Sequence, residues 1–260
     1  MQTGQTYILS AGLLSAGATS KNSYIMYQNL MPSATVTAGG DVSRLYDWMT
    51  NIKYTAAAGT TNIDLTLPSA ETINCIALAG VNWQSGGVTA KFFTWDGSQY
   101  VLQCDLFAAY DDKPVMRIIP QTQTDRVRIQ FTAENPLFVG EAAFGEALQM
   151  PSCPSVGLQP GEWSDDDEYS LSTTESRNIG PSTIERKGST QVMEFKFITP
   201  DFMDGPISNM RRLAKGRPVW VGWNQQDRPA SVIFGHWTMQ PPKFDSSTFT
   251  GLNLTIKGVV

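Results

Sequence analysis

The chain has 260 residues, a formal net charge of −5, and charged side chains at only 17% of its positions. This length suits one large or two small domains, and so few charges argue against a largely helical protein, whose exposed faces carry many Glu, Lys and Arg. The acidic balance disfavours nucleic-acid binding. No segment offers the roughly 20 apolar residues of a membrane-spanning helix, so we expect no membrane insertion.

Residues 8–18 superficially resemble the core of a signal peptide. The first lysine is Lys21, so the basic region that normally precedes such a core is missing.

The sequence has three cysteines, Cys75, Cys104 and Cys153, and no CxxC pair. This odd number argues against a complete disulfide framework. We therefore expect reduced, buried thiols in a protein that folds in the cytoplasm.

Strand patterns dominate the first half of the chain. Two of the runs flank Asp96-Gly97, a turn signal that predicts a hairpin. Several short strands at this spacing predict a sandwich of two sheets. The expected strands in this region cover residues 61–67, 73–79, 88–94 and 100–107.

The clearest alternation in the chain is the run RVRIQF that begins at Arg126. A strand with this pattern turns Val127, Ile129 and Phe131 toward the core. Arg126 and Arg128 are expected to face solvent.

The composition changes near residue 150. Residues 151–186 are rich in Pro, Ser, Thr, Gly and acidic residues and poor in aliphatic ones, which predicts an extended arm that orders on a neighbour. A solvated surface, a calcium site and a charge-complementary contact with a basic neighbour all remain open for its acidic run. This candidate assembly segment comprises Asp165, Asp166, Asp167 and Glu168.

The second half contains one predicted helix, near residues 204–215. Asp204 is expected to cap it, Pro206 to lie in its first turn and Gly216 to end it. Its buried stripe is expected to comprise Ile207, Met210 and Leu213. The expected strands around it cover residues 191–198, 218–223, 231–239 and 250–257.

No catalytic or metal-ligating pattern stands out in the sequence. The single histidine, His236, lies in a strand run, and the sequence places no partner base or nucleophile beside it. Three dispersed cysteines and one histidine make no zinc spacing, and the common phosphate-binding and hydrolase motifs are absent. The basic cluster Arg211-Arg212-Lys215-Arg217 is interpreted as the end of the predicted helix. We therefore expect no enzymatic activity, no metal and no cofactor.

Aromatic residues beside the predicted loops are the main candidates for binding. Trp83 and Trp95 flank one expected strand, and exposed Trp or Tyr side chains stack on sugars or anchor protein interfaces. The alternative is that they cap the core from the loops. The candidate ligand or partner contacts are Asn82, Trp83, Trp95, Asp96 and Tyr100.

A family resemblance begins at IALAGVNW, residues 76–83, which precede the aromatic hairpin VTAKFFTWDGSQY at 88–100. LYDW at 45–48 lies just upstream. Together these pieces resemble the discoidin-like (galactose-binding-like) jelly rolls of tailed-bacteriophage virion proteins. The resemblance covers about residues 20–135 and implies a jelly-roll sandwich as a first domain over residues 1–136.

The second half resembles the companion domain of the same virion proteins, a β-barrel with one helix that builds tail tubes and baseplate rings. This implies a second domain over residues 137–260 that includes the arm. The expected fold class is therefore mainly β, with an N-terminal jelly-roll sandwich and a C-terminal β-barrel or sandwich carrying one short α-helix. The matching pieces are VGEAAFGEAL at 139–148, IGPSTIERKG at 179–188, RPVWVGWN at 217–224 and VIFGHWT at 232–238.

The resemblance implies a structural component of a phage or phage-like tail, and more specifically a distal-tail or baseplate ring protein. Such a protein joins the tail tube to tip proteins or fibres. It forms a ring with copies of itself, six-fold or three-fold, in a virion whose subunits fold in the host cytoplasm. The alternative function is that of a carbohydrate-binding module that recognises glycans of the host surface.

Overall fold

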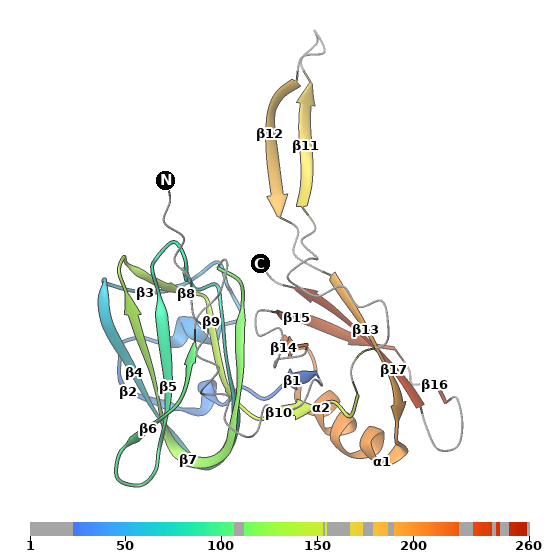
Figure 1. Ribbon diagram of the computed structural model, residues 1–260, viewed down its shortest axis with the longest axis horizontal. Coiled ribbons are helices and arrows are strands. Elements are labelled where there is room, and N and C mark those ends of the chain that lie inside the picture. The colour runs from blue at the N-terminus through green and yellow to red at the C-terminus, as the bar shows by residue number, and fades with distance from the viewer. Residues whose placement is uncertain are drawn as a thin grey trace, which may run out of the picture.

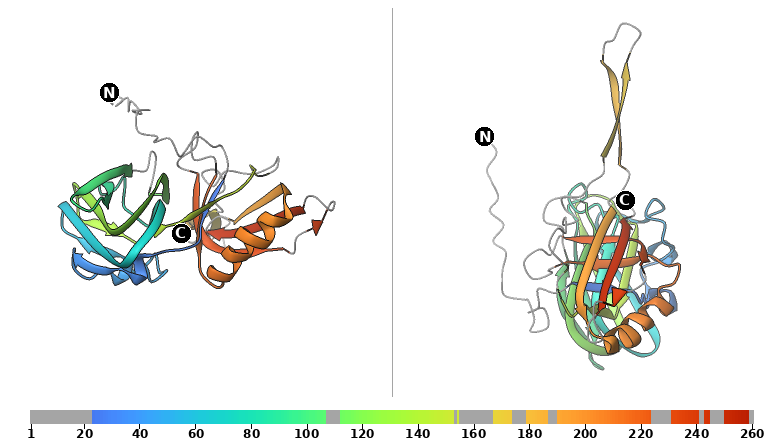
Figure 2. Two further views of the ribbon diagram at one scale, coloured as in Figure 1. Left: turned by 90° about the horizontal axis from the view of Figure 1, so that it is seen from below. Right: turned by 90° about the vertical axis from the view of Figure 1, so that its right-hand side faces the viewer.

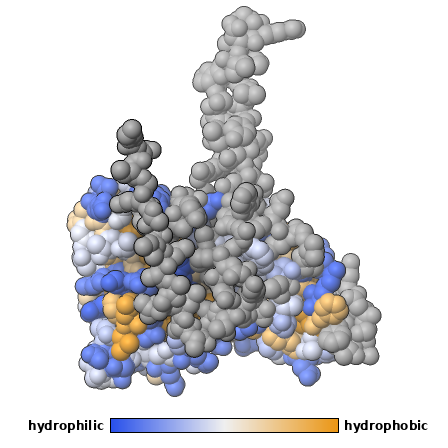
Figure 3. All heavy atoms as spheres, in the orientation of Figure 1, coloured by the Kyte–Doolittle hydropathy of each residue, from blue (hydrophilic) through white to orange (hydrophobic). Residues whose placement is uncertain are grey.

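The structure is a computed structural model that describes residues 23–106, 112–152, 154, 167–173, 179–186, 190–223, 231–240, 243–244 and 250–258. These residues form two β bodies side by side and a two-stranded ribbon that projects beyond them (Figure 1). The predicted fold class, mainly β with one short helical segment, is confirmed. Hydrophilic residues predominate on the coloured surface of the first body in Figure 3.

The helical elements among the described residues are two 3-10 turns, Met31–Ser33 and Ser43–Leu45, followed by α1 (Pro200–Phe202), a π-helical turn (Met203–Ile207) and α2 (Ser208–Leu213). The strands are β1 (Tyr24–Met26), β2 (Thr35–Ala38), β3 (Tyr54–Ala56), β4 (Gly59–Ala79), β5 (Thr89–Trp95), β6 (Tyr100–Leu106), β7 (Val115–Ala133), β8 (Leu137–Val139), β9 (Glu141–Gly145), β10 (Ala147–Gln149), β11 (Asp167–Thr173), β12 (Ile179–Arg186), β13 (Thr190–Ile198), β14 (Val219–Gly222), β15 (Val232–Met239), β16 (Lys243–Phe244) and β17 (Thr250–Gly258).

The first body is a β-sandwich built around two long strands, β4 and β7, which pair antiparallel. Their register shifts between Thr66 and Glu71, and the two parts of β4 then have different outer neighbours. The first part pairs with β2 and the second with β9, while β5 and β6 extend the sheet beyond β7. Ile63 on β4 lies opposite Ile129 on β7, and both are fully buried. The predicted inward positions of the RVRIQF run are confirmed.

The second body is a seven-stranded sheet with the strand order β10-β1-β14-β15-β17-β13, to which β16 adds beside β17. The helical segment from α1 to α2 lies across it (Figure 2). Ile207 and Met210 are buried against strand residues that include Phe195 and Leu252. The expected burial of Ile207 and Met210 is confirmed, whereas Leu213 is only half-buried.

The helical segment begins earlier than the sequence predicts. Thr199, not Asp204, accepts the capping hydrogen bond, from the backbone N–H of Phe202 at 3.4 Å. Pro206 lies inside the π-helical turn, and because proline has no N–H it interrupts the regular helical bonding there. The expected stop at Gly216 agrees with its φ of 73°, a left-handed conformation that glycine tolerates.

Strand pairing crosses the domain boundary predicted at residue 136, which stays a prediction. β1 lies between β10 and β14, so residues 24–26 belong to the second sheet although they precede the sandwich in sequence. β9 pairs with β4, so the first body continues to Gly145. Three-residue strands such as β1 are too short to show a period that could assign them to a sheet.

A shared group of buried residues joins the two bodies. The first body contributes small side chains, including Cys75, Ala77 and Ala143. The second contributes Trp220 and Phe234, whose ring centroids lie 4.4 Å apart. Small residues on one side leave room for the large rings on the other, which allows close packing. The two bodies are therefore packed against each other rather than merely tethered.

The predicted arm over residues 151–186 contains an ordered antiparallel ribbon. β11 pairs with β12 from Asp167 opposite Arg186 to Thr173 opposite Ile179. The ribbon extends away from the second body (Figures 1 and 2). Part of the expected extended arm is thus a paired ribbon, because low aliphatic content does not prevent Thr-, Ile- and Tyr-containing segments from pairing. That the arm orders on a neighbour stays a prediction. Asp165 and Asp166 lie outside the described residues, and Asp167 and Glu168 begin β11.

Candidate functional site

Charged and aromatic side chains gather on the outer face of the sandwich, where β4, β7, β5 and β6 lie next to one another. Alternation along β7 buries Val127 and Ile129 and leaves Arg126 and Arg128 on the other face. Trp95 at the end of β5 pairs with Tyr100 at the start of β6. We call the set of Asp64, Trp95, Tyr100, Arg126 and Arg128 the aromatic–arginine platform.

An ion pair and ring contacts organise the platform. Arg128 donates to both carboxylate oxygens of Asp64, from Nε at 2.6 Å and from Nη2 at 2.8 Å. Its guanidinium carbon also lies 4.1 Å from the centroid of the Tyr100 ring, within the range of a cation–π contact. The fork of two hydrogen bonds holds the guanidinium in one orientation.

The two aromatic rings contact each other edge to face. The centroids of Trp95 and Tyr100 lie 5.2 Å apart at an interplanar angle of 70°. Arg126 lies over the Trp95 ring, with its guanidinium carbon 5.4 Å from the centroid. Both rings are half-buried, so each keeps part of its surface open to a ligand.

The pKa values reflect this arrangement. The hydrogen bonds from Arg128 to Asp64 raise the pKa of the guanidinium. Burial raises the pKa of the Tyr100 hydroxyl, and the Asp64 carboxylate adds to the effect. The platform therefore presents a cationic guanidinium and a neutral phenol at neutral pH.

Asp96 has a structural role in the adjoining turn. Its Oδ1 accepts hydrogen bonds from the backbone N–H groups of Ser98 and Gln99, both at 2.8 Å, and from the Ser98 hydroxyl at 2.9 Å. These bonds lower the pKa of the Asp96 carboxyl. The turn closes the hairpin that holds Trp95 and Tyr100 together.

Asn82 and Trp83 lie apart from the platform. Trp83 is 2% exposed and belongs to the sandwich core, as in the alternative that the sequence left open. Asn82 donates to the backbone oxygen of Pro136 at 2.9 Å and accepts from the backbone N–H of Phe138 at 2.8 Å. Trp83 thus packs in the core and Asn82 fastens one loop to the next, so neither lies beside the other candidate contacts. Their role as ligand contacts stays a prediction.

Sequence reasoning missed three members of the platform, Asp64, Arg126 and Arg128. The alternation placed both arginines outward but gave them no partners. The pattern that could have found them is an outward-facing Asp on one alternating strand and an outward-facing Arg on another. If the register of the two strands were known, it would place these two side chains opposite each other. The sequence alone does not fix that register.

The described cysteines do not resemble nucleophiles. Cys75 and Cys104 are free, and burial raises the pKa of Cys75 well above its ordinary value and that of Cys104 to about 12. Both thiols therefore stay protonated at neutral pH. Cys153 lies outside the described residues.

In the described part of the chain, His, Cys, Asp and Glu form no group of three or more that could hold a metal ion. None of the helical segments there has the length and apolar character to span a bilayer.

Comparison with known proteins gives only partial likenesses. No protein-family model and no curated protein matches the chain. Among solved structures, a family 32 carbohydrate-binding module from Streptococcus pneumoniae EndoD shares 12% identity, covering 46% of this chain and 99% of that chain with a TM-score of 0.39. CpGH89CBM32-6 produced by Clostridium perfringens shares 17% identity, covering 46% of this chain and 99% of that chain with a TM-score of 0.39. A pectin-binding carbohydrate-binding module shares 15% identity over 48% of this chain and 97% of that chain, with a TM-score of 0.37. At TM-scores below 0.5 these likenesses carry no functional argument.

Proposed function

We propose that this chain is a structural subunit of a larger particle, and specifically a distal-tail or baseplate ring protein of a phage-like tail. The observation that carries the proposal is the projecting β11–β12 ribbon. An isolated two-stranded ribbon is marginally stable in water, and within the described residues β11 and β12 pair only with each other. A neighbouring subunit would cover such a ribbon and stabilise it.

The packed junction between the two bodies supports the same proposal. Trp220 and Phe234 of the second body share a buried group with residues of the sandwich, which holds the sandwich in one orientation. A ring protein needs this property, because the second body would assemble with its own copies while the sandwich faces other components. The proposed partners are copies of this chain in a six-fold or three-fold ring, the tail tube, hub or tip proteins, and fibres.

Immunogold labelling of intact phage-like particles from the source of this chain tests the proposal. We expect gold at the distal end of the tail with an antibody against the chain, and none with pre-immune serum. Gold at the head or neck would refute the proposed position. Particles without any label would refute a structural role in the virion.

The aromatic–arginine platform favours a second candidate function, glycan binding. A sugar presents apolar C–H faces that suit aromatic rings, and hydroxyl groups that suit the oxygens and N–H groups of an Asp–Arg pair. Trp95, Tyr100, Arg128 and Asp64 supply both kinds of contact on one exposed sheet face. In this reading the sandwich recognises host-surface glycan and the second body is a spacer.

A glycan array with matched variants tests this candidate. Trp95→Ala and Tyr100→Ala are expected to abolish any specific signal, because they remove the stacking surface. Phe138→Ala is the control, since Phe138 is an exposed aromatic residue on β8, outside the platform. Equal binding by all three variants, or no binding by the unaltered chain, would contradict glycan recognition by the platform.

A further inference from the structure

We propose that a basic groove beside the end of α2 binds the acidic segment 165–168 of a second copy of this chain. This inference rests on the proposed assembly function and deepens it, because it names the surfaces through which two copies meet.

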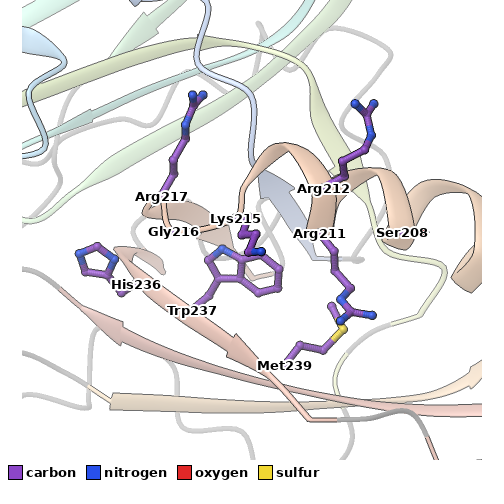
Figure 4. Close-up of a pocket in the computed structure, with 9 residues that line it drawn as sticks. All are labelled: Ser208, Arg211, Arg212, Lys215, Gly216, Arg217, His236, Trp237 and Met239. Atoms are coloured by element: carbon purple, nitrogen blue, oxygen red, sulfur yellow. The ribbon is translucent and has the colours of Figure 1, made fainter.

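The groove lies between the C-terminal end of the helical segment and β15 and has a volume of about 440 Å³. In Figure 4, Arg211 extends toward Met239, while His236 and Arg217 lie at the other end of the groove. The Trp237 ring is fixed in the groove because its Nε1 donates to the backbone oxygen of Ala214 at 3.2 Å. The charged or titratable lining residues are Arg211, Arg212, Lys215, Arg217 and His236.

Among the described residues, the positive charge of the groove meets no acidic side chain. No Asp or Glu of that part of the chain lines it. None of the ion pairs found in the described part of the chain involves its arginines or its lysine. Arg212 donates to the Asn209 side chain at 2.8 Å, and Arg217 lies over the Trp48 ring at 6.0 Å, so both contact neutral groups. The negative end of the helix dipole offsets part of this charge, but its effect is worth only about 0.3–1 kcal/mol per cation. An anionic partner therefore fits the groove.

The strongest anionic run in the sequence is the segment Asp165-Asp166-Asp167-Glu168. Its last two residues begin β11, at the base of the ribbon. The segment carries four negative charges, which match the four Arg and Lys side chains of the groove.

The position of the ribbon indicates that the groove belongs to a different copy. Figures 1 and 2 show the ribbon leaving the second body at one end, with α2 at the opposite end. The start of β11 therefore lies at the end of the second body opposite the groove of the same chain. A contact in which the base of the ribbon on one copy meets the groove on the next is head-to-tail, and such contacts generate rings when the rotation closes.

Charge reversal in the full-length chain tests the contact. Arg211→Glu with Lys215→Glu is expected to weaken self-association at least ten-fold, measured by sedimentation velocity at low salt. Asp166→Lys with Asp167→Lys is expected to weaken it by a similar factor. Combining the four substitutions is expected to restore association, because the two surfaces exchange their charges. Arg211 and Lys215 are exposed, so melting temperatures followed by circular dichroism are expected to stay unchanged.

Lys53→Glu with Lys91→Glu is the matched control, since it makes the same charge change at exposed positions of the first body. Equal weakening by this control, or no rescue by the combined variant, would overturn the groove contact. If removal of residues 167–186 abolishes association while the groove variants associate normally, the groove inference fails and the proposed assembly function stands. A chain that never self-associates would contradict the proposed ring itself.

Discussion

At the scale of single residues, core-facing and outward-facing positions alternate along β7. Ile129 is fully buried opposite Ile63, so Ile129→Asp places an unpaired charge in the core and is expected to cost more than about 4 kcal/mol of unfolding free energy. Chemical denaturation followed by fluorescence would measure the loss. A cost close to that of a surface substitution would show that this register is wrong.

Arg128 has a larger structural role than an ordinary surface arginine. The alternation alone predicts that Arg128→Asp is mild, but the structure revises this because the new carboxylate would face Asp64. Arg128→Ala is expected to cost about 1–2 kcal/mol through loss of the ion pair and the ring contact. Arg126→Ala, whose side chain is 48% exposed, is expected to cost less than about 0.5 kcal/mol. Equal costs in the same denaturation assay would contradict the platform geometry.

The burial of Glu141 predicts that the stability of the fold depends on pH. Glu141 is 1% exposed, and burial raises the pKa of its carboxyl to about 8. Its Oε2 accepts a hydrogen bond from the backbone N–H of Trp48 at 3.0 Å, which acts in the opposite direction. Between about pH 4.5 and 8 the folded chain keeps a proton that the unfolded chain releases. This contribution to stability therefore falls as pH rises through that window, by at most about 1.4 kcal/mol per pH unit.

Glu141→Gln removes the titrating group and keeps an oxygen that can accept the hydrogen bond from the backbone N–H of Trp48. Denaturation of both proteins from pH 5 to 9 is expected to show the variant gaining stability over the unaltered chain as pH rises to 8. Glu146→Gln, at an exposed position, is expected to show no such gain. A pH-independent difference at Glu141 would contradict its raised pKa.

At the scale of elements, strands with strong patterns could be predicted from the sequence and short or polar ones could not. The alternation at residues 126–131 and the turn at Asp96-Gly97 correspond to β7 and the β5–β6 hairpin. β1 was missed because its three residues show no period, and the ribbon because its polar composition looks like a linker. The platform was half predicted: Trp95 and Tyr100 were chosen for their aromatic rings, but their charged partners come from strands whose register the sequence does not specify.

The ribbon predicts where the chain is cut first. β11 and β12 lie outside both bodies, so residues 151–186 are expected to be cleaved first by a nonspecific protease in limited digestion. Mass spectrometry of the early fragments locates the cut. Early cleavage near residue 80 would contradict the fold, because Val81 and Trp83 there are buried in the sandwich core.

At the scale of the whole molecule, the junction between the two bodies predicts cooperative unfolding. Trp220→Ala is expected to cost roughly 3–5 kcal/mol, because it leaves a cavity where the two bodies meet. Differential scanning calorimetry is expected to show one transition for the unaltered chain and two for this variant. Phe138→Ala, at an exposed position, is expected to keep a single transition. Two transitions in the unaltered chain would show that the bodies unfold independently.

The central claim is that the chain assembles through its projecting ribbon. The most direct test is the mass by light scattering over a range of concentrations, with and without residues 167–186, which a short Gly-Ser linker would replace. The account predicts that the full chain forms multiples of its 28.5 kDa mass and that the variant stays monomeric with the same melting temperature. A full chain that stays at 28.5 kDa at every concentration, or a variant that assembles equally well, would contradict it.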